Sequence, residues 1–181
     1  RNLLFLRDVN GDWKIDQVDI NNIADVNGDG LEDVFAGAAT GHGGQLFIQT
    51  KNGKFSEQKV AAFETDAIHE DLDAAFFDAD NDGDLDLYVV SGGSRYPAGA
   101  DQYQDRLYLN DGIGNFSLVE GLLPENHVSG SVVTAADYDQ DGDLDLFVSV
   151  LYDPTVPQSL MFYENQGNAN NPNFRKITEN Y

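Results

Sequence analysis

Three short acidic segments hold residues whose types and spacing suit the binding of a hard cation. Each is nine residues long, follows the pattern D-x-[DN]-x-D-G-x-x-D, and together they contain thirteen aspartates. In such loops the side chains at positions 1, 3 and 5 point inward, position 7 supplies its backbone carbonyl, and a later carboxylate closes the shell. The predicted ligands are Asp25, Asn27, Asp29, Leu31 and Asp33 in the first loop, Asp78, Asp80, Asp82, Asp84 and Asp86 in the second, and Asp137, Asp139, Asp141, Asp143 and Asp145 in the third.

Oxygen ligands at this density favour Ca²⁺, and we expect three ions per chain. The chain has no cysteine and no paired histidines, which argues against zinc or copper, and magnesium prefers fewer protein ligands. The alternative is that each run of Asp, Asn and Gly is an ordinary hairpin turn. Charge disfavours it, because two carboxylates about 4 Å apart repel by ~4 kcal/mol at an effective dielectric constant of about 20.

The residues after the loops distinguish them from helical calcium motifs. An EF-hand requires a glutamate at position 12 and a helix behind it, and a dockerin-like module also uses helices. Here position 12 lies in segments rich in Val, Leu, Phe and Tyr, and its occupants are Ala36, Val89 and Val148. We therefore assign closure of the shell to position 9.

The acidic loops belong to a repeat that predicts an all-β fold. They start 53 and 59 residues apart, and each is followed by an apolar strand, a glycine-bearing turn and an aromatic strand. One unit reads as strands over 72–77, 85–91, 106–110 and 115–120, which is the size of a propeller blade. We predict one repeat domain over 1–181, with a partial blade at 1–20 and blades at 21–60, 61–120 and 121–181.

The segment Asp8–Asp16 imitates an acidic loop, but we expect no metal there. Trp13 stands where the other loops have glycine, and a bulky residue is strained in a left-handed turn. The segment aligns better as a hairpin with one strand at Leu4–Leu6 and the other at Trp13. Three and a half blades are too few for closure, so we expect an open arc completed by further blades of the same or another chain.

The repeat resembles the FG-GAP or VCBS-type repeat of integrin α-subunit propellers and of many bacterial surface and secreted proteins. The residues that carry the resemblance are Asp78–Val90 together with Leu107–Phe116 and the corresponding segments of the other units. The resemblance implies a β-propeller, usually of about seven blades, with calcium in the loops between the first and second strands. It also implies an extracellular location, either secreted or at the cell surface.

Composition limits the classes of partner. The net charge of −22 argues against nucleic acid, whose phosphates require a basic face, and equally against anionic membranes. No apolar run reaches the length of a membrane span, so we expect no membrane insertion.

We expect a non-catalytic module that recognises a protein or glycan. The variable segments 36–45, 92–105 and 151–159 should lie opposite the metals, and Arg95, Tyr96 and Tyr103 are the candidate exposed contacts. The alternatives are the propeller domain of a carbohydrate-active enzyme such as a polysaccharide lyase, or a structural spacer. Catalysis is disfavoured because each of the three histidines lies in a loop without a partnered motif.

Overall fold

The structure is a computed structural model, which describes residues 5–7, 13–15, 22–151, 160–168 and 171–177. Its strands form three four-stranded antiparallel sheets and one hairpin. The first sheet contains β3 (Ile23–Ala24), β4 (Asp33–Ala36), β5 (Gln45–Gln49) and β6 (Phe55–Gln58). The second contains β7 (Asp71–Phe77), β8 (Asp86–Ser91), β9 (Arg106–Asn110) and β10 (Phe116–Leu118). The third contains β11 (Gly130–Ala136), β12 (Asp145–Val150), β13 (Leu160–Asn165) and β14 (Phe174–Ile177).

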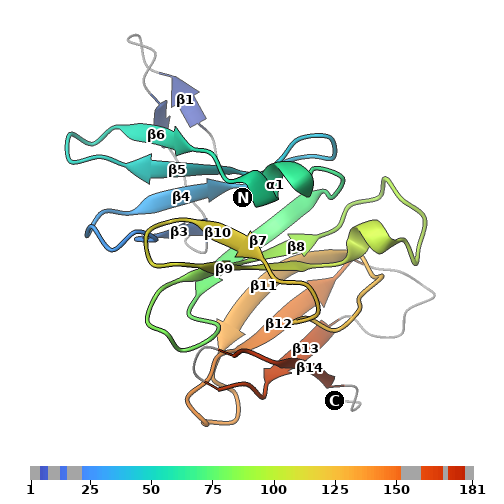
Figure 1. Cartoon of the computed structure of the whole chain (residues 1–181). Coiled ribbons are helices and arrows are strands. Elements are labelled where there is room, and N and C mark those ends of the chain that lie inside the picture. The colour runs from blue at the N-terminus through green and yellow to red at the C-terminus, as the bar shows by residue number, and fades with distance from the viewer. Residues whose placement is uncertain (1–4, 8–12, 16–21, 152–159, 169–170, 178–181) are drawn as a thin grey trace.

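Strands follow one another in sequence order across each sheet, as the repeat predicts. The sheets form a stack in which the second lies between the first and the third (Figure 1). No closure into a ring is seen among the described residues, and the all-β prediction with propeller-type blades is confirmed.

The leading hairpin also forms as predicted. Strand β1 (Phe5–Arg7) pairs antiparallel with β2 (Trp13–Ile15), and Arg7 lies opposite Trp13. The residues that join the two strands, including Asp8 and Asp12, where we expect no metal, lie outside the described residues.

Helical structure is minor in the described part of the chain. Helix α1 (Ala61–Thr65) lies between the first and second sheets, and a 3₁₀ turn, η2 (Asp101–Tyr103), precedes β9. Phe63 of α1 is buried, with its ring centroid 5.3 Å from that of Phe35 and 5.0 Å from that of Tyr108. None of the described helices has the length and apolarity needed to span a membrane.

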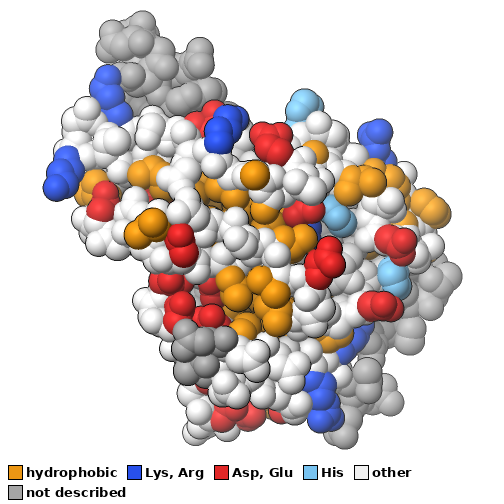
Figure 2. Space-filling model, viewed as in Figure 1, with side chains coloured by type: hydrophobic (Ala, Val, Ile, Leu, Met, Phe, Trp, Pro, Cys, Tyr) orange, Lys and Arg blue, Asp and Glu red, His pale blue; other side chains and the backbone are white. Residues whose placement is uncertain are grey.

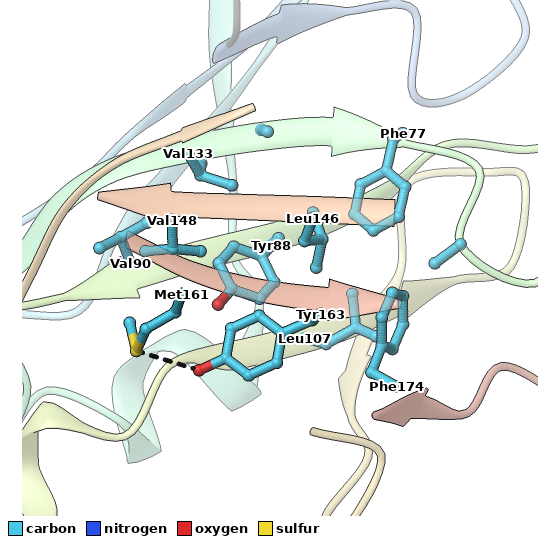
Figure 3. Close-up of a cluster of buried hydrophobic side chains, with 12 residues drawn as sticks. Phe77, Tyr88, Val90, Leu107, Val133, Leu146, Val148, Met161, Tyr163 and Phe174 are labelled. Atoms are coloured by element: carbon cyan, nitrogen blue, oxygen red, sulfur yellow. Dashed lines mark hydrogen bonds between the residues drawn. The ribbon is translucent and has the colours of Figure 1, made fainter. Parts of the chain in front are cut away.

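Two hydrophobic cores hold the sheets together. Between the first and second sheets, Phe35 and Leu46 pack with Val89 and Tyr108 around Phe63. The core between the second and third sheets is drawn in Figure 3, where side chains of β8 and β9 face those of β12 and β13. Its members include Tyr88, Val90, Leu107, Leu146, Val148, Met161 and Tyr163.

The second and third sheets approach closely where β8 ends and β11 begins. Gly92, just after β8, forms a parallel bridge with Gly130 at the start of β11. A Cβ atom added to Gly130 would lie only 2.4 Å from the side chain of Val90. Since only glycine leaves this space, the contact fixes how closely the two sheets pack.

Candidate metal sites in the acidic loops

All three acidic loops emerge on one side of the molecule, each between the first and second strands of its sheet (Figure 1). Figure 2 shows a group of Asp and Glu side chains on that side, over the loops of the second and third sheets. The segments 37–44 and 92–105, which follow the second strands, lie on the opposite side. This arrangement agrees with the separation of metal loops from variable loops that the repeat predicts.

The backbone turns sharply at two positions in every loop. Position 6 is glycine with φ of +85°, +97° and +100° in the three loops, at Gly30, Gly83 and Gly142. Position 4 is also left-handed, with φ of +72°, +57° and +64° at Gly28, Asn81 and Gln140. The glycine at position 6 was foreseen, whereas position 4 was missed because its residue type varies.

Carboxylates converge in the second and third loops. Oxygen atoms of Asp78, Asp80 and Asp86 lie within 4.8 Å of one another, and so do those of Asp137, Asp139 and Asp145. These are positions 1, 3 and 9 of each loop. In the first loop position 3 is Asn27, so the same positions supply two carboxylates and one amide oxygen.

The position 9 carboxylates are buried and anchored on both oxygens. Asp86 accepts hydrogen bonds from the backbone N–H groups of Ala79 (2.9 Å) and Asn110 (2.9 Å). Asp33 and Asp145 accept equivalent pairs, from Val26 and Gln49 and from Tyr138 and Asn165. Each carboxylate oxygen has a further lone pair, so this anchoring leaves room for a metal bond.

The remaining loop carboxylates hold the backbone in its curve. Asp78 accepts hydrogen bonds from the N–H groups of Asp82 and Gly83, and Asp25 does the same with Asp29 and Gly30. Position 5 accepts from the N–H of position 7 in every loop; the acceptors are Asp29, Asp82 and Asp141. The loops are therefore shaped by their own side chains toward a common centre.

Electrostatics in the second loop oppose full ionisation. Burial raises the pKa of Asp86 to about 7, and burial with repulsion from Asp82 raises that of Asp84 to about 6. The pKa of Asp80 is raised by the same two causes. In addition, Asp80 is only 8% exposed, and its Oδ1 has no hydrogen-bond partner, nor does the buried Oδ1 of Asp84.

The residues therefore fit a divalent cation. Buried carboxylate oxygens without a partner are costly unless a proton or cation binds them. All the donors are hard oxygens, which suit Ca²⁺ or Mg²⁺ rather than zinc. Positions 1, 3 and 9 of the second and third loops could hold the ion together, while the assignment of positions 5 and 7 stays a prediction.

The candidate contacts in the loop at 92–105 differ in exposure. Arg95 is exposed and Tyr96 is half-buried, with its hydroxyl donating to the carbonyl of Ile68 (3.1 Å). Tyr103 is only 4% exposed and donates to the carbonyl of Tyr96 (2.5 Å). The prediction that Tyr103 is exposed was wrong, because the side chain is held within the loop, where its ring packs edge-on against that of Tyr96 with the centroids 6.4 Å apart.

The histidines do not assemble into one site. His69 is partly buried, with Nδ1 2.9 Å from the carbonyl of Gln102, and burial lowers its pKa. His127 lies with Nδ1 3.4 Å from Asp101, and His42 is exposed in the loop after β4. No two of these side chains share a contact that would form an acid–base pair.

A buried polar network behind the variable loops was not foreseen from the sequence. Arg106 forms an ion pair with Asp71 (2.5 Å), and its Nη1 lies 3.3 Å from the hydroxyl of Tyr108. That hydroxyl donates to Asp66 (2.8 Å). The network ties α1 and β7 to β9, and its only sequence signal was a charged residue at the start of a strand.

Comparison with known families agrees with this geometry. A family model described as FG-GAP-like repeat matches residues 25–89 and 96–148, which is more than half of the chain. No curated protein matches. The two matched segments contain all three acidic loops, the whole of β4, β7 and β11, and most of β8 and β12, while β3 lies just before the first segment. The chain therefore belongs to the FG-GAP-like repeat family.

Proposed function

We propose that this chain is a calcium-binding β-propeller module that recognises a protein or glycan outside the cell and does not itself catalyse a reaction. The observation that carries the metal assignment is the second loop, where three carboxylates converge and two buried oxygens have no hydrogen-bond partner. The third loop repeats the convergence, and the first shares the pattern with Asn27 at position 3. Three Ca²⁺ ions per chain follow from this repetition.

The role of the metal is structural. Bound Ca²⁺ would replace repulsion among the loop carboxylates with attraction and so stabilise the connections between the first two strands of each sheet. The opposite side of the same sheets carries the variable loops. A rigid scaffold with variable loops is a common arrangement for recognition, so that side is where we place the ligand.

Calorimetry and thermal unfolding test the metal assignment. We expect about three Ca²⁺ per chain, and a melting temperature that falls by many degrees in EDTA. Each site contributes about 2.7 kcal/mol at a hundredfold excess of Ca²⁺ over Kd. Asp82→Ala and Asp141→Ala should each remove one site, whereas Asp101→Ala, an exposed carboxylate outside the loops, should remove none. An identical melting curve with and without EDTA would show that the loops are ordinary turns.

The rival function, a polysaccharide lyase or other carbohydrate-active domain, needs a separate assay. We expect the isolated chain to bind a member of a glycan array or a protein partner, with no cleavage of uronic-acid polymers. Arg95→Ala should weaken that binding, since Arg95 is the exposed member of the candidate contacts. Cleavage of a uronic-acid polymer that persists after further purification of the protein would overturn the non-catalytic assignment.

A further inference from the structure

We propose that Asn110 and Asn165 are positioning residues, each of which holds the metal loop of the preceding sheet. This inference rests on the proposed calcium binding and adds a coupling between sites. The two residues end β9 and β13, the third strands of their sheets, and are 8% and 2% exposed. Neither was among the predicted ligands.

Asn165 of the third sheet reaches into the loop of the second. Its Nδ2 donates a hydrogen bond to the carbonyl of Ala79 (3.0 Å). Ala79 is position 2 of that loop and lies between the candidate ligands Asp78 and Asp80. Its own N–H is held by Asp86, so both peptide groups of Ala79 are fixed.

Asn110 of the second sheet does the same for the loop of the first. Its Nδ2 donates to the carbonyl of Val26 (2.8 Å), and the N–H of Val26 donates to Asp33. The same Nδ2 also reaches the carbonyl of Leu85 in its own loop (3.1 Å). The arrangement thus occurs at both interfaces between sheets, across 84 and 86 residues of sequence.

The chemistry of both positions requires an amide side chain. The Oδ1 of Asn165 accepts hydrogen bonds from the N–H groups of Gly167 (3.1 Å) and Asn173 (3.2 Å). The Oδ1 of Asn110 accepts likewise from Asp111 and Gly114. Because the oxygen is held by these amides, the NH₂ group must face the neighbouring loop, and a carboxylate of the same shape lacks that donor.

Backbone contacts extend these pairs into one hydrogen-bonded chain. Asn110 N–H donates to Asp86, and Asn165 N–H donates to Asp145, so each asparagine also anchors the position 9 carboxylate of its own loop. A further contact joins the second and third loops directly, from the amide of Asn81 to the carboxylate of Asp143. The hydrogen-bonded chain contains Asp33, Val26, Asn110, Asp86, Ala79, Asn165, Asp145 and Tyr138.

Among the described residues, the third loop has no asparagine contact from a following sheet. Its position 2 residue is Tyr138, which is 55% exposed, whereas Val26 and Ala79 are each 1% exposed. Within the described residues its N–H is held by Asp145, and no further sheet covers it. Since a preorganised site binds its ligand more tightly, the second loop should have a higher affinity for Ca²⁺ than the third, which has aspartates at the same five positions.

Site-resolved calcium titration tests the proposal. The backbone amide signals of Gly30, Gly83 and Gly142 in NMR spectra report the three loops separately. In Asn165→Ser, the serine oxygen can still accept from the Gly167 N–H but is too short to reach Ala79. We expect Kd at the second loop to rise about tenfold, the equivalent of one hydrogen bond, with Kd at the first loop changed less than twofold.

Asn110→Ser should raise Kd at the first loop by a similar factor, and Gln49→Ser is the matched control. Gln49 occupies the same register in the first sheet, and its N–H binds Asp33 in the same way. We expect that control to leave the second and third loops unchanged. Asn165→Asp, which keeps the acceptor and loses the donor, serves if the serine variant does not fold.

Several results would overturn the inference. An equal loss of affinity at all three loops would indicate general destabilisation rather than positioning. If the wild type binds Ca²⁺ and the variants have the same Kd values as the wild type at all three loops, the positioning role is refuted and calcium binding stands. Glycine signals that ignore Ca²⁺ in the wild type would refute the proposed function, and this inference with it.

Discussion

At the scale of single residues, buried charge and strained backbone determine where the chain is sensitive to change. Asp105 is an example at the end of the second sheet opposite the acidic loops. It is 3% exposed and accepts hydrogen bonds from the N–H of Ser91 (2.8 Å), the hydroxyl of Tyr88 (2.8 Å) and the amide of Asn126 (3.4 Å). Burial nevertheless raises its pKa to about 6.

The raised pKa of Asp105 predicts a pH-dependent stability. The folded state binds a proton at Asp105 more tightly than the unfolded state does. The contribution of Asp105 to the free energy of unfolding is therefore complete below about pH 4 and is lost as the pH rises through 6. A pKa raised from 3.8 to about 6 corresponds to at most ~3 kcal/mol in the free energy of unfolding. In Asp105→Asn, the new amide can accept from Ser91 and donate to the oxygen of Tyr88. We expect this variant to lose much less stability between pH 4.5 and 7.5.

Urea unfolding at the two pH values, with saturating Ca²⁺, measures this difference. The matched control is Asp101→Asn, whose side chain is 92% exposed and should leave the slope of stability against pH unchanged. An Asp105→Asn variant with the same slope as the wild type would show that Asp105 does not titrate in this range.

The left-handed residue Gln140 gives a second prediction. Its φ of +64° lies in the left-handed region, which is unfavourable for glutamine. Asparagine, which stands at the equivalent position 81, tolerates this region better because its short side chain can hydrogen-bond to the nearby backbone. Gln140→Asn should therefore raise the free energy of unfolding by roughly 0.5–1 kcal/mol. Gln140→Ala, with no such tolerance, should give no gain. Chemical denaturation of the wild type and the two variants measures the difference. Equal stabilities of the wild type and Gln140→Asn would contradict the prediction.

At the scale of elements, the sequence predicted what is local and missed what is distant. The strands, the glycine turns and the leading hairpin follow from alternation and turn residues, and each is found within a residue or two of its expected bounds. The role of Asn165 could not be predicted in the same way. In the sequence Asn165 is only one residue of a predicted hairpin. Its partner carbonyl belongs to Ala79, 86 residues earlier, so no local pattern indicates the contact.

The same reason explains the misjudged Tyr103 and the unforeseen network around Arg106. Composition places aromatic and charged residues near loops on the surface, but in the structure Tyr103 and Arg106 are only 4% and 6% exposed. Once covered, each requires a specific partner, and Arg106 has Asp71. A single sequence gives no signal for a pair separated by 35 residues.

The close approach of the second and third sheets predicts the effect of a single methyl group. In Gly130→Ala the added Cβ would lie 2.4 Å from the Val90 side chain, so the sheets must separate or Val90 must move. We expect a loss of about 1–3 kcal/mol in the free energy of unfolding. Val90→Ala removes the clashing atoms, so the double variant should lose less than the two single variants together. Strict additivity in this double-mutant cycle would mean that the two side chains do not meet.

At the scale of the whole molecule, the stack of sheets has an end whose outer surface is partly apolar. Residues of the third sheet alternate between its two faces, and Val133, Val148 and Met161 pair across the face toward the second sheet. The outward face carries Phe147 and Phe162, whose rings stack at 4.5 Å, with Tyr138 against both. Its equivalents in the second sheet, such as Tyr88, are fully buried by the third.

This outward face leads to a prediction about association. Among the described residues, Val132, Tyr138 and Leu160 are 55%, 55% and 48% exposed. Val132 and Leu160 both pair with Ser149, one on each side of it, so they lie near each other on the same face. Grouped exposed apolar side chains are normally covered by a partner surface. We therefore expect the 181-residue chain to self-associate as its concentration rises, with this face in the contact, unless further blades of a longer chain cover it. Static light scattering should show a weight-average mass above the 19.9 kDa of one chain.

Replacing Val132 and Leu160 with serine should return the mass toward that of a monomer, because both side chains lie on the exposed face and neither belongs to the cores between sheets. Ile113→Ser is the matched control, since Ile113 is 64% exposed in the turn after β9 of the second sheet and should leave association unchanged. A wild-type chain that stays monomeric at every concentration would contradict the prediction. In that case the aromatic stack of Tyr138, Phe147 and Phe162 would be sufficient to close this end of the molecule without a partner.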